Sequence, residues 1–84
     1  MIYVYVLKSQ VDHFHYIGQT QSLSDRLRAH NNGKVRSTKA HRPYSLIYTE
    51  IFHSRSEAIK RETYLKHGKG NQWLREFLTE KGLW

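Results

Sequence analysis

The 84 residues provide enough chain for one domain, residues 1–84, with a small hydrophobic core. The formal net charge of +7 favours nucleic acid as a partner over an anionic membrane, although the charges could also serve only solubility. The chain has no cysteine, which excludes disulfides and thiolate metal sites. It shows no secretory or membrane-spanning pattern, so we expect a cytoplasmic protein without a membrane partner.

Two short strands are predicted at the start of the chain. Residues 2–8 and 14–18 are rich in β-branched and aromatic residues, and a polar turn between them favours an antiparallel hairpin. The alternation places Tyr3 and Tyr5 on one face and aliphatic residues on the other. The hairpin would bring Tyr5 near Tyr16. On this evidence alone, ordinary strand tyrosines are the favoured interpretation, because tyrosine is common in sheets.

A helix is predicted to begin at Ser22, with Asp25 three residues later in a capping-box pattern. Its apolar stripe includes Arg26 and His30, where purely structural helices carry aliphatic residues. Ionisable groups at such positions either have a partner that satisfies them or work in a site. The Asn-Asn-Gly sequence at residues 31–33 predicts the end of the helix.

A basic polar loop follows the first helix and ends at Pro43. Its mixture of positive charges and hydroxyl groups suits contacts with phosphate oxygens, although such loops are often only solvated connections. The predicted nucleic-acid contacts are Lys34, Arg36, Lys39 and Arg42.

Residues 45–52 predict a third strand. Apart from Thr49 and Glu50, both of its faces are apolar. Parallel or central strands that are covered on both sides have this pattern. We therefore expect a central strand, or one with helices on both faces.

A second helix is predicted from Ser54, with Glu57 in a capping box, to about His67. In contrast to Glu57, Glu62 lies on the apolar stripe of this helix. A carboxylate there must be neutralised, paired or bound to a cation. A salt bridge to Arg26 or Arg61 and ligation of a metal ion are both consistent with the pattern.

The last predicted helix covers residues 71–81, with Asn71 as its N-cap. Its apolar residues at helical spacing, Trp73, Leu74, Phe77 and Leu78, are expected to pack on the sheet. Trp73 as a platform for stacking a base is the weaker alternative.

Four motifs occur along this order of elements: Tyr3-Val4-Tyr5, Tyr16-Ile17-Gly18, Arg26 with His30, and the run 58–62 that ends in Glu62. Together they resemble the GIY-YIG nuclease superfamily, which includes an excinuclease component and intron-encoded homing endonucleases, and most closely its small standalone bacterial members. The resemblance covers about residues 2–75. It implies an α+β fold with a three-stranded antiparallel sheet flanked by helices, in the order β-β-α-β-α-α. It also implies DNA cleavage that depends on a divalent metal.

The resemblance also implies a role for each matching residue. Glu62 would be the only protein ligand of one Mg²⁺ or Mn²⁺ ion, and Tyr16 would be the general base or would position the water. Tyr5 would orient the nucleophile or the phosphate. Arg26 would stabilise charge on the scissile phosphate, and His30 would act in proton transfer or phosphate binding. The family's downstream asparagine has no clear counterpart, since Asn71 also suits a helix cap.

The leading hypothesis is a metal-dependent endonuclease that hydrolyses DNA phosphodiester bonds, with a role in DNA repair or recombination. A noncatalytic nucleic-acid-binding module of the same fold is the alternative. Glu62 favours the enzyme, because a binding module has no need of a carboxylate that faces a polyanion. An activity that requires a partner protein or a homodimer is a third hypothesis, and the sequence does not specify the preferred DNA structure.

Overall fold

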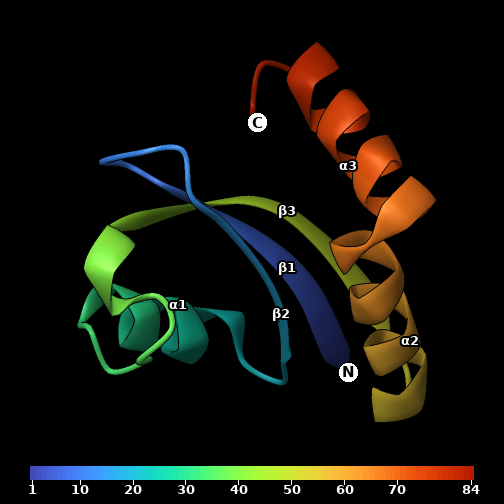
Figure 1. The fold of residues 1–84 in the computed structure, drawn as a ribbon. Coiled ribbons are helices and arrows are strands. Elements are labelled where there is room, and N and C mark those ends of the chain that lie inside the picture. Colours follow the sequence, from blue (N-terminus) through green and yellow to red (C-terminus); the bar gives the residue numbers. More distant parts are fainter.

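The computed structural model describes all residues 1–84 and has the predicted order β-β-α-β-α-α, with a one-turn 3-10 helix before the third strand (Figure 1). The strands form one antiparallel sheet in the order β2-β1-β3. The elements are β1 (Ile2–Ser9), β2 (His15–Thr20), α1 (Leu23–Asn31), η1 (Lys39–His41), β3 (Tyr44–Phe52), α2 (Arg55–Lys66) and α3 (Gly68–Glu80). None of the helices has the length and apolar character needed to cross a membrane.

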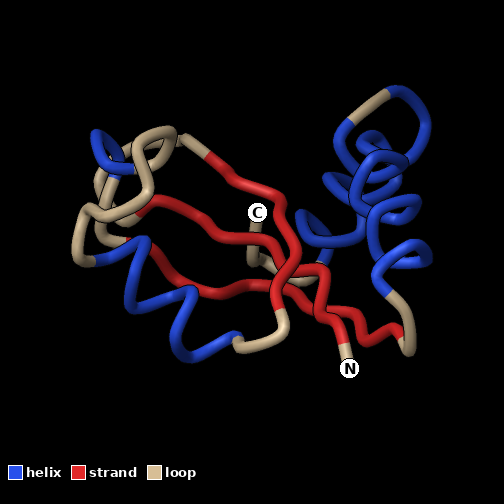
Figure 2. Tube along the Cα trace, turned by 90° about the horizontal axis from the view of Figure 1, so that it is seen from below, coloured by secondary structure: helices blue, strands red, loops and turns tan.

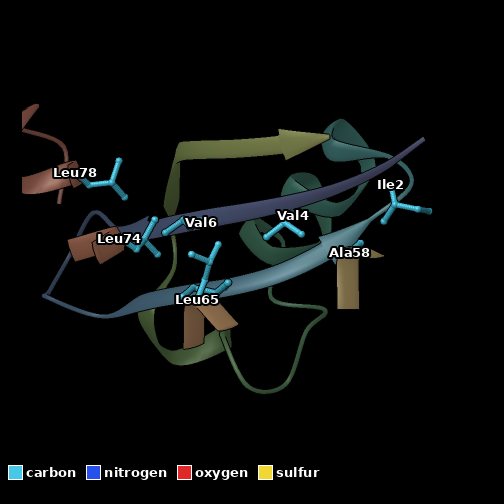
Figure 3. Packing of buried hydrophobic residues seen from close by; sticks show 8 residues of the cluster. Ile2, Val4, Val6, Ala58, Leu65, Leu74 and Leu78 are labelled. Carbon is cyan, nitrogen blue, oxygen red and sulfur yellow. The ribbon is translucent and has the colours of Figure 1, made fainter. Parts of the chain in front are cut away.

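The sheet separates two layers of helices (Figures 1 and 2). The larger core lies between the sheet and the pair α2 and α3 (Figure 3). Alternate residues of β1 point to the other side, where Tyr5 and Leu7 pack with Tyr44 and side chains of α1. The larger core consists of Ile2, Val4, Val6, Ile17, Ala58, Leu65, Leu74 and Leu78. Tyr5 therefore belongs to the smaller, aromatic layer, as the strand alternation predicts.

The predicted hairpin is confirmed, whereas the prediction of a central third strand is wrong. β1 is central, and β3 is an edge strand. On β3, Leu46 lies opposite Leu7 and Ile51 opposite Tyr3, and both aliphatic side chains are exposed. β3 contacts both α1 and α2, as the alternative of helices on both faces predicts, yet Leu46 and Ile51 stay exposed. The sequence of a strand does not show which of its positions the neighbouring helices cover.

The helix starts differ in their capping. The Oγ of Ser54 accepts a hydrogen bond from the backbone N–H of Glu57 at 3.3 Å, which confirms this predicted cap of α2. Ser22 occupies the N-cap position of α1 but makes no capping hydrogen bond with its side chain, so the predicted capping box with Asp25 is wrong. Asp25 instead pairs with Arg28 on the exposed face of the helix.

The last helix begins at Gly68, three residues earlier than predicted, and Asn71 is not its N-cap. Gly68 adopts a positive φ of 52° at the corner, so α3 starts at once after α2. At Gly70 a Cβ atom would lie 2.0 Å from the carbonyl oxygen of Tyr64, so only glycine allows the two helices to approach this closely. The Asn71 amide donates to the carbonyl oxygen of Leu65 at 2.9 Å, which links α3 to α2 at the same corner.

Candidate active site

Two phenols lie together over one glycine of β2. Tyr5 pairs with Gly18 across the β1 and β2 strands. A Cβ atom at Gly18 would lie 2.7 Å from the hydroxyl oxygen of Tyr5 and 2.8 Å from a ring carbon of Tyr16. The two rings have centroids 6.1 Å apart. The hairpin thus brings the predicted pair together, and glycine provides the space that both rings occupy.

A buried chain of hydrogen bonds runs from the first phenol into the loop after α1. The Tyr5 hydroxyl lies 2.9 Å from Nε2 of His30, and Nδ1 of His30 lies 2.8 Å from Oγ1 of Thr38. Because the Thr38 hydroxyl donates to the carbonyl oxygen of Val35, it accepts from Nδ1–H of the histidine. The Nε2 atom then accepts from Tyr5. This assignment fixes His30 as a neutral ring with a defined tautomer.

The electrostatics agree with this direction of donation. Burial lowers the pKa of His30 to about 4, and the positive charge of Arg26 contributes to the shift in the same sense. Burial raises the pKa of Tyr5 to about 12, against the opposing effect of the nearby Arg26 guanidinium. Tyr5 is only 2% exposed and His30 is fully buried. At neutral pH the pair is therefore an uncharged phenol that donates to an uncharged imidazole.

Arg26 extends from α1 towards both phenols. Its favourable interaction with the Tyr5 hydroxyl raises the pKa of the guanidinium, and Tyr16 adds to this effect. Both Arg26 and Tyr16 are half-buried, so they keep contact with solvent. The polar residues on the buried stripe of α1 thus have partners, and the partners are the tyrosines of the two motifs.

Glu62 is paired within its own helix. Its carboxylate lies 2.6 Å from Nζ of Lys66, one turn later in α2, and its side chain is 18% exposed. The predicted alternatives, a salt bridge to Arg26 or Arg61, are wrong, since Arg61 pairs with Glu50 at 2.7 Å. Among the causes that raise the pKa of Tyr5, burial is the largest and the charge of Glu62 is the smallest, so the carboxylate interacts weakly with this phenol.

A single carboxylate of this kind can hold one hard divalent cation. Mg²⁺ keeps several waters and is commonly bound by one or two carboxylates together with phosphate oxygens of the substrate. No group of three or more metal-binding side chains is present. The donor set around Glu62 therefore fits an ion that takes most of its ligands from water and from a bound phosphate.

The basic loop lies beside this cluster and is tied to it through Thr38. Arg36, Lys39 and Arg42 line a concave surface with a volume of about 590 Å³. Lys34 is exposed in the same loop but does not line this surface. Because Thr38 bonds to His30 in the site, the position of the loop is coupled to that of the buried histidine.

Sequence reasoning missed three supporting residues. Lys66 follows Glu62 by four residues, and this spacing on a helix is a signal that could have identified it. Thr38 accepts the hydrogen bond from Nδ1 of His30, and the Tyr44 hydroxyl donates to the carbonyl oxygen of Thr38 at 2.7 Å. Neither contact has a periodic or spacing signal, because loop and strand meet only in the folded chain.

Known proteins are similar to this chain in sequence and in fold. Residues 1–75 match the family described as the GIY-YIG catalytic domain. A UPF0213 protein of Clostridium perfringens is 43% identical over 75 residues, which cover 88% of this chain and 80% of the relative. A UPF0213 protein of Streptococcus pneumoniae serotype 4 is 43% identical over 79 residues, which cover 93% and 78%. The solution NMR structure of a UPF0213 protein from Bacillus halodurans has a TM-score of 0.56 and 31% identity, with 98% of this chain and 87% of that chain covered. The chain belongs to the GIY-YIG family.

Proposed function

We propose that residues 1–84 act as one domain that hydrolyses phosphodiester bonds in DNA with one Mg²⁺ or Mn²⁺ ion held by Glu62. The observation that carries the proposal is the meeting of Tyr5 and Tyr16 over Gly18, with Arg26 interacting with both phenols and Glu62 acting weakly on Tyr5. Membership of the GIY-YIG family supports nuclease chemistry for this cluster. Such an activity would serve DNA repair or recombination.

The half-buried residues of the cluster are the ones that can reach a substrate. Tyr16 would orient the attacking water and accept its proton as a general base. Arg26 would stabilise the charge that develops on the phosphate. Both side chains retain contact with solvent, as these roles require.

The buried residues of the cluster would position Tyr16 and Arg26. Burial keeps His30 away from DNA, so we assign it a positioning role in place of direct phosphate binding. It accepts a hydrogen bond from Tyr5 and thereby fixes the phenol against Arg26. Tyr5 in turn aligns the guanidinium and the second phenol.

Glu62 would hold the cation, which would replace the Lys66 ammonium as the partner of this carboxylate. A bound divalent ion supplies Lewis-acid stabilisation of phosphate oxygens. The basic loop would contact the DNA backbone through Lys34, Arg36, Lys39 and Arg42, consistent with the net charge of +7.

The ion pair between Glu62 and Lys66 also favours a second candidate. A carboxylate that is already neutralised within its helix suits a nucleic-acid-binding module that lacks catalysis. Both candidates bind DNA, and only the first cuts it.

Cleavage of labelled duplex, branched and single-stranded DNA in Mg²⁺, Mn²⁺ or EDTA distinguishes the two. We expect metal-dependent cutting by the wild type and a loss of about 100-fold or more in Glu62→Gln, by analogy with the removal of one group that stabilises charge in a transition state. Glu76→Gln on the exposed face of α3 is the matched control and should cut normally. Salt-sensitive binding by the wild type without any cutting would support the binding module, and equal cutting by Glu62→Gln would refute the assigned metal ligand.

A further inference from the structure

The chain after α3 turns back towards the sheet (Figure 1). Gly82 has a φ of 72°, its N–H donates to the carbonyl oxygen of Thr79 at 3.0 Å, and the N–H of Leu83 donates to the carbonyl oxygen of Leu78 at 2.8 Å. This pair of bonds is a Schellman motif, which requires a left-handed residue such as glycine. The motif ends the helix and directs the next residues over the start of β2.

Trp84 is held at that position by both its ring and its main chain. The indole stacks on the imidazole of His15, with ring centroids 3.6 Å apart and planes inclined by 6°. The Nζ of Lys8 donates to the main-chain oxygen of Trp84 at 2.7 Å. The tryptophan therefore stands next to Tyr16, although it lies outside the residues 1–75 that match the family.

A pocket of about 370 Å³ opens beside this stack. Tyr16 and Lys66, the partner of Glu62, are among the residues that line it, so the pocket borders the candidate active site. Its volume falls in the range of small-molecule sites in proteins. The lining residues are His15, Tyr16, Ile17, Lys66, Asn71 and Trp84.

The walls combine flat aromatic rings with groups that can form hydrogen bonds. The Nε2 atom of His15 has no hydrogen-bond partner, but it is buried and so is not itself presented at the pocket surface. The Asn71 amide nitrogen is used by Leu65, and its carbonyl oxygen has no protein partner and can accept. A nucleobase offers a π-face for stacking and donors and acceptors along its edge, which is the complement of such walls.

We propose that this pocket binds an unpaired nucleobase next to the phosphate at Tyr16, so that the substrate is DNA with an unpaired nucleotide at the cleavage point. A base inside a duplex is stacked and paired, and its extrusion is least costly where the base is already unpaired. The inference rests on the proposed function, because it assigns the phosphate of that nucleotide to the candidate active site.

Binding tests the pocket separately from cleavage. Three DNAs carry 2-aminopurine in a paired position, in a one-nucleotide bulge or in a single strand, and are titrated with protein in EDTA. We expect the wild type to bind the bulge and the single strand at least about 10-fold more tightly than the paired duplex, with quenching of 2-aminopurine as it stacks. Trp84→Ala should lose this preference and the quenching, and Trp84→Phe should restore both in part. Trp73→Ala removes a tryptophan on α3 outside the pocket and should retain them.

Circular dichroism and thermal melting show whether each variant folds, and Trp84→Leu keeps the apolar packing if Trp84→Ala does not. Equal affinity of the wild type for bulged and paired DNA would refute the proposal that the pocket binds a nucleobase. An unchanged preference in folded Trp84→Ala or Trp84→Leu would also refute it. Metal-dependent cutting that Glu62→Gln abolishes would then still support the nuclease. Preference for the bulge without any cutting would support the pocket and refute the nuclease, and no binding to any DNA would overturn both.

Discussion

The buried imidazole of His30 should make the stability of the protein depend on pH in a predictable way. Its pKa is lowered from 6.5 to about 4, mainly by burial, so the folded protein binds fewer protons than the unfolded chain between these values. The stability that this group contributes is therefore complete above pH 6.5 and is lost as the pH falls towards 4. The difference corresponds to roughly 3 kcal/mol over the full range and about 2 kcal/mol at pH 5.

His30→Gln isolates this contribution, because glutamine can still accept a hydrogen bond from Tyr5 but does not titrate. The free energy of unfolding is measured by urea denaturation for both proteins at pH 7.5 and pH 5. We expect the wild type to lose about 2 kcal/mol more than the variant between these two values. His53→Gln, at an exposed position, is the control and should follow the wild type.

Identical losses in the wild type and in His30→Gln would refute the reasoning. Such a result would mean that the imidazole is protonated in the folded protein at pH 5, so that it donates at both nitrogens. The Tyr5 hydroxyl could then not donate to it, and the inferred direction of the hydrogen-bond chain from Tyr5 to Thr38 would be wrong.

Three further predictions concern the site. Gly18→Ala should reduce DNA cleavage about 100-fold, because its Cβ would lie 2.7 Å from the Tyr5 hydroxyl and a displacement near 1 Å usually costs this much. Gly68→Ala is the control, because no atom lies near its Cβ. It should destabilise the fold but cut normally at a temperature where both variants are folded. Lys66→Met should lower the Mg²⁺ concentration for half-maximal cleavage, because it removes the cation that pairs with the proposed ligand, and a higher concentration would contradict this competition. Arg36→Ala should reduce the slope of log affinity against log salt by about 1, whereas Arg75→Ala on α3 should leave the slope unchanged.

The sequence predicts the architecture well because its main signals are periodic. Alternation in residues 2–8 assigns Tyr5 and Val4 to opposite faces, and a short turn leaves an antiparallel hairpin as the simplest pairing. The same logic fails for β3, where the pattern shows which residues are apolar but not whether a helix covers them. Burial in a sheet depends on neighbours that are distant in sequence.

The candidate site is predicted to a similar extent and for similar reasons. Pairing between strands is enough to place Tyr5 beside Tyr16. The partner of His30 is harder to predict, because Thr38 comes from an irregular loop. For Glu62, the apolar stripe suggested a salt bridge to Arg26 or Arg61 or ligation of a metal ion, whereas the long and flexible side chain of Lys66 reaches the carboxylate along the same helix. The glycines at residues 68 and 70 predicted the end of the second helix, and α2 does end at Lys66. The sequence did not show that the next helix starts at Gly68, in a corner that the missing side chain of Gly70 makes possible.

The division of the sheet into two unequal faces explains why the site sits where it does. The face covered by α2 and α3 carries the aliphatic core, which is dry and supplies most of the apolar burial. The opposite face can therefore use Tyr5 and His30, which are as buried as core residues yet joined by hydrogen bonds. Such a satisfied polar pair is rigid, because each partner would lose its bond if it moved. Rigidity behind Arg26 is what a site needs when it must hold charge-stabilising groups in place before the substrate arrives.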